Sequence, residues 1–577
     1  AINNTAVGYN ALYQNTTGAG NVALGVEALK ENTTADQNTA VGYLALKVNT
    51  TGGANVAVGY AALTSNTTAA NNSAVGYGAL SGNTTGSENT ALGLQALQNN
   101  TTAAHNTAVG YRALKANTTG TNNVAVGTNA LLDATTSDQN IAIGNNAGEN
   151  ITSDKNVAVG HNALATATTG EHNTGVGDGV LANSSTSKNC AFGYHALVNQ
   201  TTGSYNNAFG HNCMDATVTG PYNNAFGQNA LGALTGGTKN NAFGQDCLAN
   251  LTTGDYNNAF GNSALVNNNA DYNTAMGHDA LAANTTGTRN AAFGNNALDA
   301  NTTGIDNTAV GGGALSANTT ASNNTAVGSN CLAGNTTGDN CVAIGHDVME
   351  GSNGDSNTGV GFEAMKTLTT GDNNTAVGRQ CLNSITTGRF NTALGTSGQG
   401  VTTGENNSFI GYNAGSASSP SGNITTGNNN FVLGDDYIAN LYCNDTSISS
   451  SDARDKTDIE DFKYGLSWIT ELRPVTYRWD KRSWYTDDPD TKGTPDGSKK
   501  RDRIHVGFLA QEAIEVEKKF GYADKKDNML IVNQDEDEKD PSYGMKYERL
   551  VPVLVNAIKE LSAENNALKA RLDAAGL

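Results

Sequence analysis

The chain has 577 residues, of which 37% are apolar and only 15% are charged, well below the roughly 25% charged residues of a typical globular domain. Glycine is abundant with 68 residues, proline is scarce with 7, and the formal net charge is −20. This composition excludes a collagen, a proline-rich disordered chain, and a broad basic surface for nucleic acid or anionic membrane. Because no apolar run approaches 18 residues, we also expect no membrane insertion.

A repeat of about 17 residues occupies most of the chain. The segment NTAVGYNALYQNTTGAG is followed by NVALGVEALKENTTADQ and then by NTAVGYLALKVNTTGGA, and the pattern recurs in 26 copies up to Asn430. With the leading Asn as position zero, position two is nearly always Ala, position three is apolar, position four is Gly and position eight is usually Leu. A period this short fits one coil of a parallel β-solenoid. The chain also begins inside a repeat, so we expect an N-terminal attachment module to precede it.

Within each coil we expect two short strands. The first covers Thr5–Val7 and ends at Gly8, the second contains Ala11 and Leu12, and the NTTG stretch forms a turn. Positions three and eight are expected to stack into a thin core, and the leading Asn side chains to form an amide ladder. The Ala column at position two would then face outward and pack against another copy. The alternative is a monomeric solenoid with alanine on its surface.

The series Ala6-Val7-Gly8 and its copies in the other coils resemble the β-roll heads of trimeric autotransporter adhesins. This resemblance implies a homotrimer. We therefore expect a mostly β protein whose residues 1–440 form a homotrimeric parallel β-solenoid shaft, followed by a linker over residues 441–450.

The composition changes after residue 450. Residues 451–577 carry all three Trp and 22 of the 33 basic residues. The segments Ser451–Asp480, Val506–Gly521 and Tyr547–Leu577 together resemble, in order, the endosialidase-type C-terminal intramolecular chaperone. That self-cleaving domain ends many phage tail fibres and tailspikes. The resemblance implies a small α+β domain that aligns three chains, folds the shaft and is then released.

The same resemblance implies a site for self-cleavage. In that family a Ser and a Lys five residues later form the catalytic dyad, and the matching residues here are Ser451 and Lys456. A serine hydroxyl needs a base, and Lys can serve when its pKa is lowered by burial or by a cationic neighbour such as Arg454. The family's release point corresponds to the Ser451–Asp452 junction, whereas an N-to-O acyl shift would break the bond between Ser450 and Ser451. Both bonds stay candidates.

The last 31 residues show a heptad pattern that predicts a coiled coil over residues 547–573. Its seam positions alternate in steps of four and three: Tyr547, Val551, Leu554, Ile558, Leu561, Asn565, Leu568 and Leu572. Asn565 is the one polar seam residue, a common device for fixing register or strand number. The alternative is an amphipathic helix that packs on its own domain.

Other residues could serve in binding. Exposed aromatic columns can contact sugar rings, and the candidates for glycan contact are Tyr205, Tyr222, Tyr256 and Tyr272. The alternative is an aromatic ladder that supports the coils, like Tyr43, Tyr60, Tyr77 and Tyr111 at position five. Cys213, Cys247, Cys331 and Cys381 share position seven and are expected to be small core residues. We expect no cofactor and no metal site.

These patterns lead to a structural and adhesive function. We expect a homotrimeric phage tail fibre in the virion that binds a host-surface glycan or protein, with no nucleic acid as partner. The expected chemistry is a single autoproteolytic cleavage near Ser451, with no enzymatic activity in the shaft. Two alternatives remain. A bacterial or other extracellular surface adhesin could use the same modules, and a tailspike could degrade host glycan.

Overall fold

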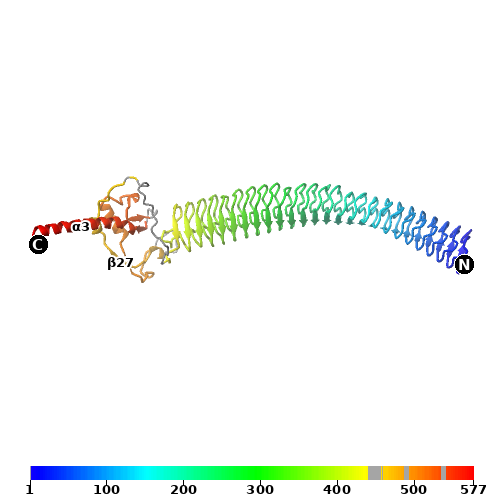
Figure 1. Cartoon of the computed structure of the whole chain (residues 1–577), viewed down its shortest axis with the longest axis horizontal. Coiled ribbons are helices and arrows are strands. Elements are labelled where there is room, and N and C mark those ends of the chain that lie inside the picture. Colours follow the sequence, from blue (N-terminus) through cyan, green and yellow to red (C-terminus); the bar gives the residue numbers. More distant parts are fainter. Residues whose placement is uncertain (1, 439–456, 458, 486–492, 535–540, 577) are drawn as a thin grey trace. The chain divides into compact units, whose positions relative to one another are not determined.

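The computed structural model describes residues 2–438, 457, 459–485, 493–534 and 541–576. The chain divides into two compact units, Ala1–Phe362 and Glu363–Leu577. In the first unit one coil follows another along the sequence, and every coil contributes one short strand (Figure 1).

The first unit holds 22 strands of three residues within its described range. They are β1 (Thr5–Val7), β2 (Val22–Leu24), β3 (Thr39–Val41), β4 (Val56–Val58), β5 (Ser73–Val75), β6 (Thr90–Leu92), β7 (Thr107–Val109), β8 (Val124–Val126), β9 (Ile141–Ile143), β10 (Val157–Val159), β11 (Thr174–Val176), β12 (Cys190–Phe192), β13 (Asn207–Phe209), β14 (Asn224–Phe226), β15 (Asn241–Phe243), β16 (Asn258–Phe260), β17 (Thr274–Met276), β18 (Ala291–Phe293), β19 (Thr308–Val310), β20 (Thr325–Val327), β21 (Val342–Ile344) and β22 (Thr358–Val360).

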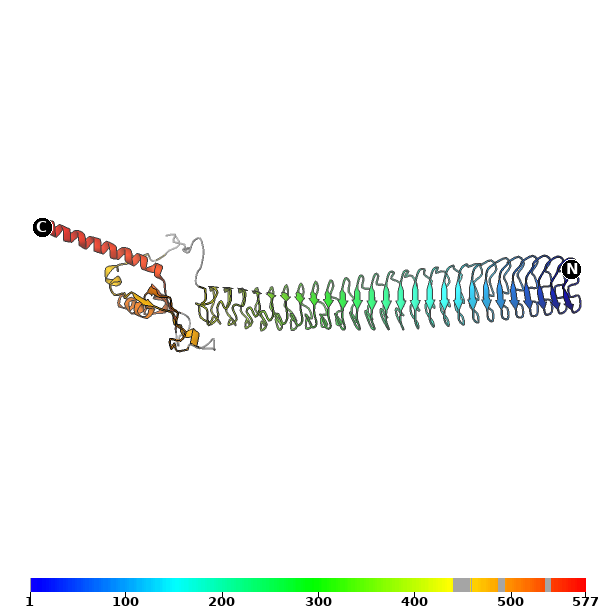
Figure 2. The same cartoon turned by 90° about the horizontal axis from the view of Figure 1, so that it is seen from below.

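Consecutive strands pair in parallel with the repeat in register. Val7 therefore lies opposite Leu24, and each repeat position pairs with the same position of the next coil. The amide of Thr5 donates to the carbonyl of Asn21 at 2.8 Å, and the amide of Gly25 donates to the carbonyl of Val7 at 2.8 Å. The strands form one row along the coils (Figure 2). The predicted parallel β-solenoid is therefore confirmed.

The interior of each coil differs from our expectation. The middle residue of every strand from β2 to β22, nearly always Ala, is buried, whereas no residue at position three is buried. Ala40 is fully buried while Leu24 keeps 47% of its surface exposed. The prediction that the position-three column lies inside and the Ala column outside is therefore wrong.

The reason is the width of the coil. Position two points at the Leu side chains of position eight, and the space there is small. At Gly175, which replaces the usual Ala in β11, an added Cβ would lie 2.5 Å from Leu164 Cδ1 and 3.1 Å from Val180 Cγ1. Only Gly or Ala fits such a site in nearly every coil, so the larger apolar side chains of the strand face outward.

The second strand expected in each coil is also absent from the described coils. The segment around Ala28 and Leu29 is a turn, and Leu29 has a positive φ of 46° although its side chain is fully buried. A non-glycine residue in this conformation costs roughly 1–2 kcal/mol, which burial of the Leu side chain offsets. Position eight thus belongs to the core as predicted, but it reaches the core from a turn.

Two asparagine ladders run through the interior. In the first, Oδ1 of Asn21 accepts from the amide of Asn38 at 2.9 Å, and Nδ2 of Asn21 donates to the carbonyl of Ala35 at 2.9 Å. This confirms the predicted ladder at position zero. The second ladder, at the Asn of the NTT turns, was not predicted: Nδ2 of Asn66 donates to Oδ1 of Asn49 at 2.9 Å. Both ladders satisfy buried polar groups at the bends.

The second unit begins with four strands of the same kind, β23 (Thr375–Val377), β24 (Thr392–Leu394), β25 (Ser408–Ile410) and β26 (Phe431–Leu433). The long step between the last two keeps its register, because Ser408 pairs with Phe431 and the amide of Asn430 donates to Oδ1 of Asn407 at 3.0 Å. At position two of β25, Phe409 is fully buried in place of the usual Ala.

A small α+β domain follows. Its elements are α1 (Leu466–Ile469), β27 (Val475–Tyr477), η2 (Arg482–Tyr485), β28 (His505–Gly507), α2 (Ala510–Lys519), η3 (Lys526–Asn528), β29 (Val532–Gln534), β30 (Tyr543–Met545), η4 (Tyr547–Arg549) and α3 (Leu550–Ala574). β27 pairs with β28 and β29 with β30, both antiparallel.

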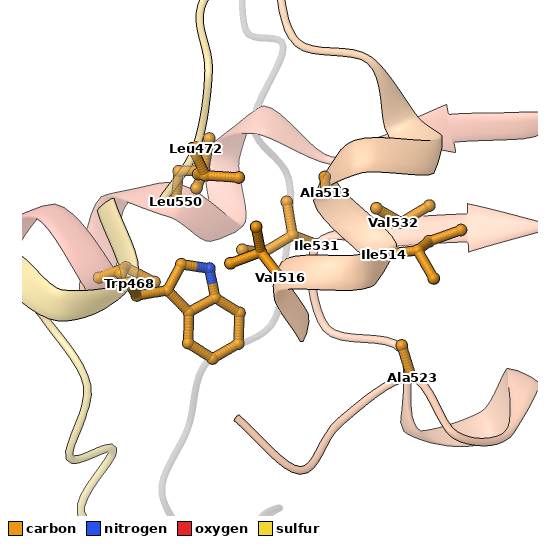
Figure 3. Close-up of a cluster of buried hydrophobic side chains, with 10 residues drawn as sticks. Trp468, Leu472, Ala513, Ile514, Val516, Ala523, Ile531, Val532 and Leu550 are labelled. Carbon is orange, nitrogen blue, oxygen red and sulfur yellow. The ribbon is translucent and has the colours of Figure 1, made fainter. Parts of the chain in front are cut away.

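The core of this domain is built around Trp468, whose side chain is fully buried and stacks on Phe520 with ring centroids 4.9 Å apart. Leu472, Val516 and Leu550 surround it (Figure 3). This core joins segments from α1, α2 and α3, so the domain has the non-repeating interior that the coils lack.

None of the helices described is long and apolar enough to cross a membrane.

Candidate functional site

The outward face of the strands in the first unit is an apolar surface. We call the side chains at position three of β1–β22 the outer column. Exposed fractions reach 47% at Leu92, 42% at Ile143 and 48% at Met276. Because each member lies above the same position of the next coil, the column is continuous along the strands.

An apolar surface of this kind is typical of a protein interface. A Val or Leu side chain gains about 1.5–3 kcal/mol on full burial, so a column whose members are partly exposed offers a partner at most about 1 kcal/mol per coil. Such a gain recurs in every coil. The outer column, and not the Ala column, is therefore the apolar face that the strands leave exposed.

The second unit shows the same feature in its own strands. Val377 is 38% exposed, Leu394 is 41% exposed and Ile410 is 38% exposed. Position three is thus the outward apolar position in both units.

The heptad positions of the last helix form a second apolar surface. The predicted helix is present as η4 and α3. Exposed fractions along the seam are 56% at Val551, 67% at Ile558, 55% at Leu561 and 53% at Leu568. The seam is therefore open to a partner helix.

A different face of α3 holds the helix on its own domain. Leu550, Val553 and Ala557 are buried, the carboxylate of Glu560 accepts from the amide of Leu466 at 2.6 Å, and Nδ2 of Asn556 donates to the carbonyl of Phe462 at 2.6 Å. The two alternatives for this helix thus describe two faces of it: one packs on the domain, and the other carries the free seam.

The predicted processing residues cannot be placed. Ser450, Ser451, Asp452, Arg454 and Lys456 all lie outside the described residues. The dyad and both candidate bonds stay predictions from sequence.

The four tyrosines predicted to contact glycan stack on one another in two pairs. The rings of Tyr205 and Tyr222 lie 5.0 Å apart at an interplanar angle of 11°, and those of Tyr256 and Tyr272 lie 5.1 Å apart at 9°. The ammonium of Lys188 lies 4.9 Å from the centroid of the Tyr205 ring.

Lysine ammonium groups also hold the edges of two of these rings. Lys188 donates to the hydroxyl of Tyr205 at 2.7 Å, and Lys239 donates to that of Tyr256 at 2.8 Å. Stacked neighbours cover ring faces that a sugar would otherwise use, so the geometry favours the supporting ladder over a platform for sugar rings. Glycan contact through these tyrosines stays a prediction.

The position-seven cysteines are core residues, as expected. Cys213, Cys247, Cys331 and Cys381 are fully buried, and burial raises the pKa of Cys213 and of Cys247 to about 12. In the part of the chain that the structure describes, no three His, Cys, Asp or Glu residues gather to hold a metal ion.

The fold and these surfaces define a class of protein: a parallel β-solenoid of short coils, joined in sequence to a small α+β domain, with apolar surfaces open on both. Residues 451–522 match the family described as chaperone of endosialidase. The chain therefore carries a chaperone-of-endosialidase domain near its C-terminal end. The match covers the first two of the three segments recognised in the sequence, and α3 lies beyond it.

No curated protein and no solved structure matches the chain significantly.

Proposed function

We propose that three copies of this chain form a fibre whose C-terminal domain aligns them, starts the folding of the solenoid and then cuts itself off. The observation that carries this proposal is the chaperone-of-endosialidase match over residues 451–522. Two features of the described residues support it. The outer column and the seam of α3 are both apolar and exposed, and both need a partner that repeats as they do.

Folding physics explains why such a fibre needs an aligning domain. Neighbouring coils are nearly identical, so two copies that are offset by one coil bury almost the same surfaces. A coiled coil at the end of the chain fixes the relative level of the copies before the coils form. Folding can then propagate from coil to coil.

The cleavage is proposed as a single intramolecular reaction. The hydroxyl of Ser451 gives its proton to the neutral amine of Lys456, and its oxygen attacks the carbonyl carbon of Ser450. The peptide C–N bond breaks as an ester forms, and the released nitrogen of Ser451 takes the proton. Water then hydrolyses the ester and restores the hydroxyl. The other candidate is direct cleavage between Ser451 and Asp452.

Intact mass spectrometry and a denaturing gel of the purified full chain test this step. We expect two fragments that meet at residue 451, and their masses distinguish the two bonds because the fragments differ by one serine. Ser451→Ala and Lys456→Ala should abolish cleavage, whereas Ser450→Ala, the matched control, should still be cut. Cleavage of the Ser451→Ala chain would overturn the dyad.

We further propose that the fibre serves attachment, as a tail fibre of a phage virion that binds a host-surface glycan or protein. The support is the resemblance of the C-terminal domain to those that end tail fibres and tailspikes. Binding of the purified fibre to host cells and to a glycan array tests it. Depolymerisation of a polysaccharide by the fibre would favour the tailspike instead.

A further inference from the structure

One stretch of the outer column differs from the rest. In β12–β18 the Val, Leu and Ile of the other strands give way to larger side chains, here called the aromatic block: Phe192, Phe209, Phe226, Phe243, Phe260, Met276 and Phe293. Successive Phe rings from β12 to β16 stack face to face with centroids 4.6–4.8 Å apart. Phe260, Met276 and Phe293 are 36%, 48% and 37% exposed.

Position one of the same strands is also distinctive. Where most coils carry Thr or Val, β13–β16 carry Asn, and these side chains form a ladder of their own. Nδ2 of Asn207 donates to Oδ1 of Asn224, Asn224 to Asn241 and Asn241 to Asn258, each at 2.7 Å. This ladder is partly buried and lies on the outward side of the strands, since position one alternates with the buried Ala.

We propose that the aromatic block and its Asn ladder are a register key, a surface that packs against the same stretch of the other copies and fixes their relative level. This inference rests on the proposed fibre of several copies. The partner that best fits this surface is a second copy of the chain. The Phe rings recur about every 4.7 Å along the coils, so a partner needs side chains at the same spacing. Another copy of this chain has this spacing because its coils are identical.

A slip in register changes the side-chain contacts at both ends of the aromatic block. If one copy slips by one coil, Phe192 moves to the level of Val176 or of Phe209, and Phe293 moves to the level of Val310 or of Met276. One ring then meets a smaller Val at each end, which leaves a gap or forces a clash. Elsewhere in the column the same slip exchanges similar aliphatic side chains and costs little.

The Asn ladder sharpens the effect. A slip places an amide of one copy against an apolar or smaller group of another, such as Cys190 or Thr274, and an amide without a partner in an interface is unfavourable. A single buried Asn fixes register in coiled coils in the same way. The key ends at β18, several coils before β26 in the sequence, so it can hold register after the C-terminal domain has been released.

The test reads register directly in the full-length chain. Two tagged versions are co-expressed, one with Thr90→Cys in β6 and one with Thr107→Cys in β7, and disulfides between copies are identified by peptide mass. Copies in register form disulfides that join position 90 to position 90, or position 107 to position 107. A slip of one coil joins position 90 of one copy to position 107 of another.

We expect disulfides between positions 90 and 107 to be rare with the native key. The yield of these disulfides should rise about tenfold when the six Phe and Met276 are all changed to Val. The outer column then carries similar aliphatic side chains throughout, so a slip by one coil no longer mismatches large and small residues. The control changes Val327, Ile344 and Val360 to Ala, which removes apolar surface outside the key and away from its flanking residues and should leave the ratio unchanged. An unchanged ratio in the key variant would overturn the inference.

A second variant keeps the number of Phe side chains but moves both ends of the aromatic block by one coil, through Val176→Phe and Phe293→Val, while the Asn ladder stays in place. Co-expressed with the native chain, it should form mixed assemblies several-fold less often than two native chains do. Equal mixing would contradict the key.

Measurements on the native chain distinguish a failure of the register key from a failure of the proposed fibre. Light scattering that finds only monomers would refute the proposed function. Trimers whose register does not depend on the key would refute the key alone. Hydroxyl-radical oxidation of Phe209 in the assembled fibre as fast as that of Tyr205 would show that no copy covers this face, and would overturn the key in favour of another occupant.

Discussion

The coils and the C-terminal domain are stabilised in different ways. A coil has no core of its own: its Ala, Leu and Asn pack on the same residues of the next coil, and every contact recurs one repeat later. The C-terminal domain buries one Trp and one Glu in sites that occur once, and its core joins segments far apart in sequence. The first arrangement has many nearly equal pairings, and the second has one.

This difference shows where the information for register lies. A repeated sequence builds a long surface from one short pattern. When one copy slips by one repeat against another, however, few contacts change. A domain with a unique core and a coiled-coil seam supplies one alignment. Within the solenoid, only departures from the repeat, such as the aromatic block, can add to it.

Removal of residues 451–577 should have the largest effect. We expect the remaining chain to form heterogeneous, misaligned or aggregated species, because nothing aligns the copies before the coils form. Size-exclusion chromatography with light scattering, and electron microscopy of particle lengths, measure this outcome. A homogeneous trimer of uniform length from the truncated chain would refute the chaperone role.

Within the domain, the largest single effect should come from Glu517. Its fully buried carboxylate accepts from the amides of Leu530, Ile531 and Val532 at 2.8, 2.8 and 2.9 Å. Glu517→Ala leaves these buried donors without an acceptor and should cost about 3–5 kcal/mol of domain stability.

Urea unfolding followed by Trp fluorescence reports this loss for the domain alone, because all three Trp follow residue 467. The control is Glu515→Ala on the same helix. Glu515 is exposed and pairs with Lys518 at 2.7 Å, so its loss should change stability by less than about 0.5 kcal/mol. Equal losses for both variants would contradict the role given to Glu517.

In the solenoid, two neighbouring glycines offer a matched pair. Gly311 directly follows β19 and has a φ of 135°, and a Cβ there would lie 2.6 Å from the carbonyl carbon of Gly328 in the next coil. Next to it, Gly312 has free space, with the nearest atom 4.0 Å away. Gly311→Ala should cost about 2–4 kcal/mol from backbone strain and crowding, and Gly312→Ala less than about 0.5 kcal/mol.

Because neighbouring coils support each other directly, the damage from Gly311→Ala should be local. Hydrogen exchange should rise in β19 and β20 while the Trp signal of the C-terminal domain stays unchanged. Exchange that rises uniformly along the chain would argue against nearest-neighbour stabilisation.

The buried thiols should be nearly unreactive in the native chain. Burial raises the pKa of Cys213 and Cys247 to about 12, so they stay protonated and should react with iodoacetamide at pH 8 far more slowly than in the unfolded chain. Between about pH 9 and 12 the unfolded chain releases these protons before the folded one does, and stability should therefore fall as pH rises. Fast native alkylation of either thiol, mapped by peptide mass, would contradict their burial.

Much of the fold could be predicted from the repeat itself. The invariant Gly at position four, the Asn at position zero and the seam from Tyr547 to Leu572 each predicted a feature that the structure shows, because each depends on local backbone geometry or on a fixed period. The second Asn ladder could have been found from the Asn of each NTT turn, which recurs with the same period as the first.

The sequence by itself determined that the strands alternate between two faces, and that one face carries Ala and the other Val or Phe. Only the tertiary structure decided which face lies inside, because that depends on the width of a coil closed by buried Leu at position eight. The narrow interior accepts the methyl group of Ala, and the larger side chains are left on the surface. A pattern usually taken as a core thus becomes a surface that needs a partner.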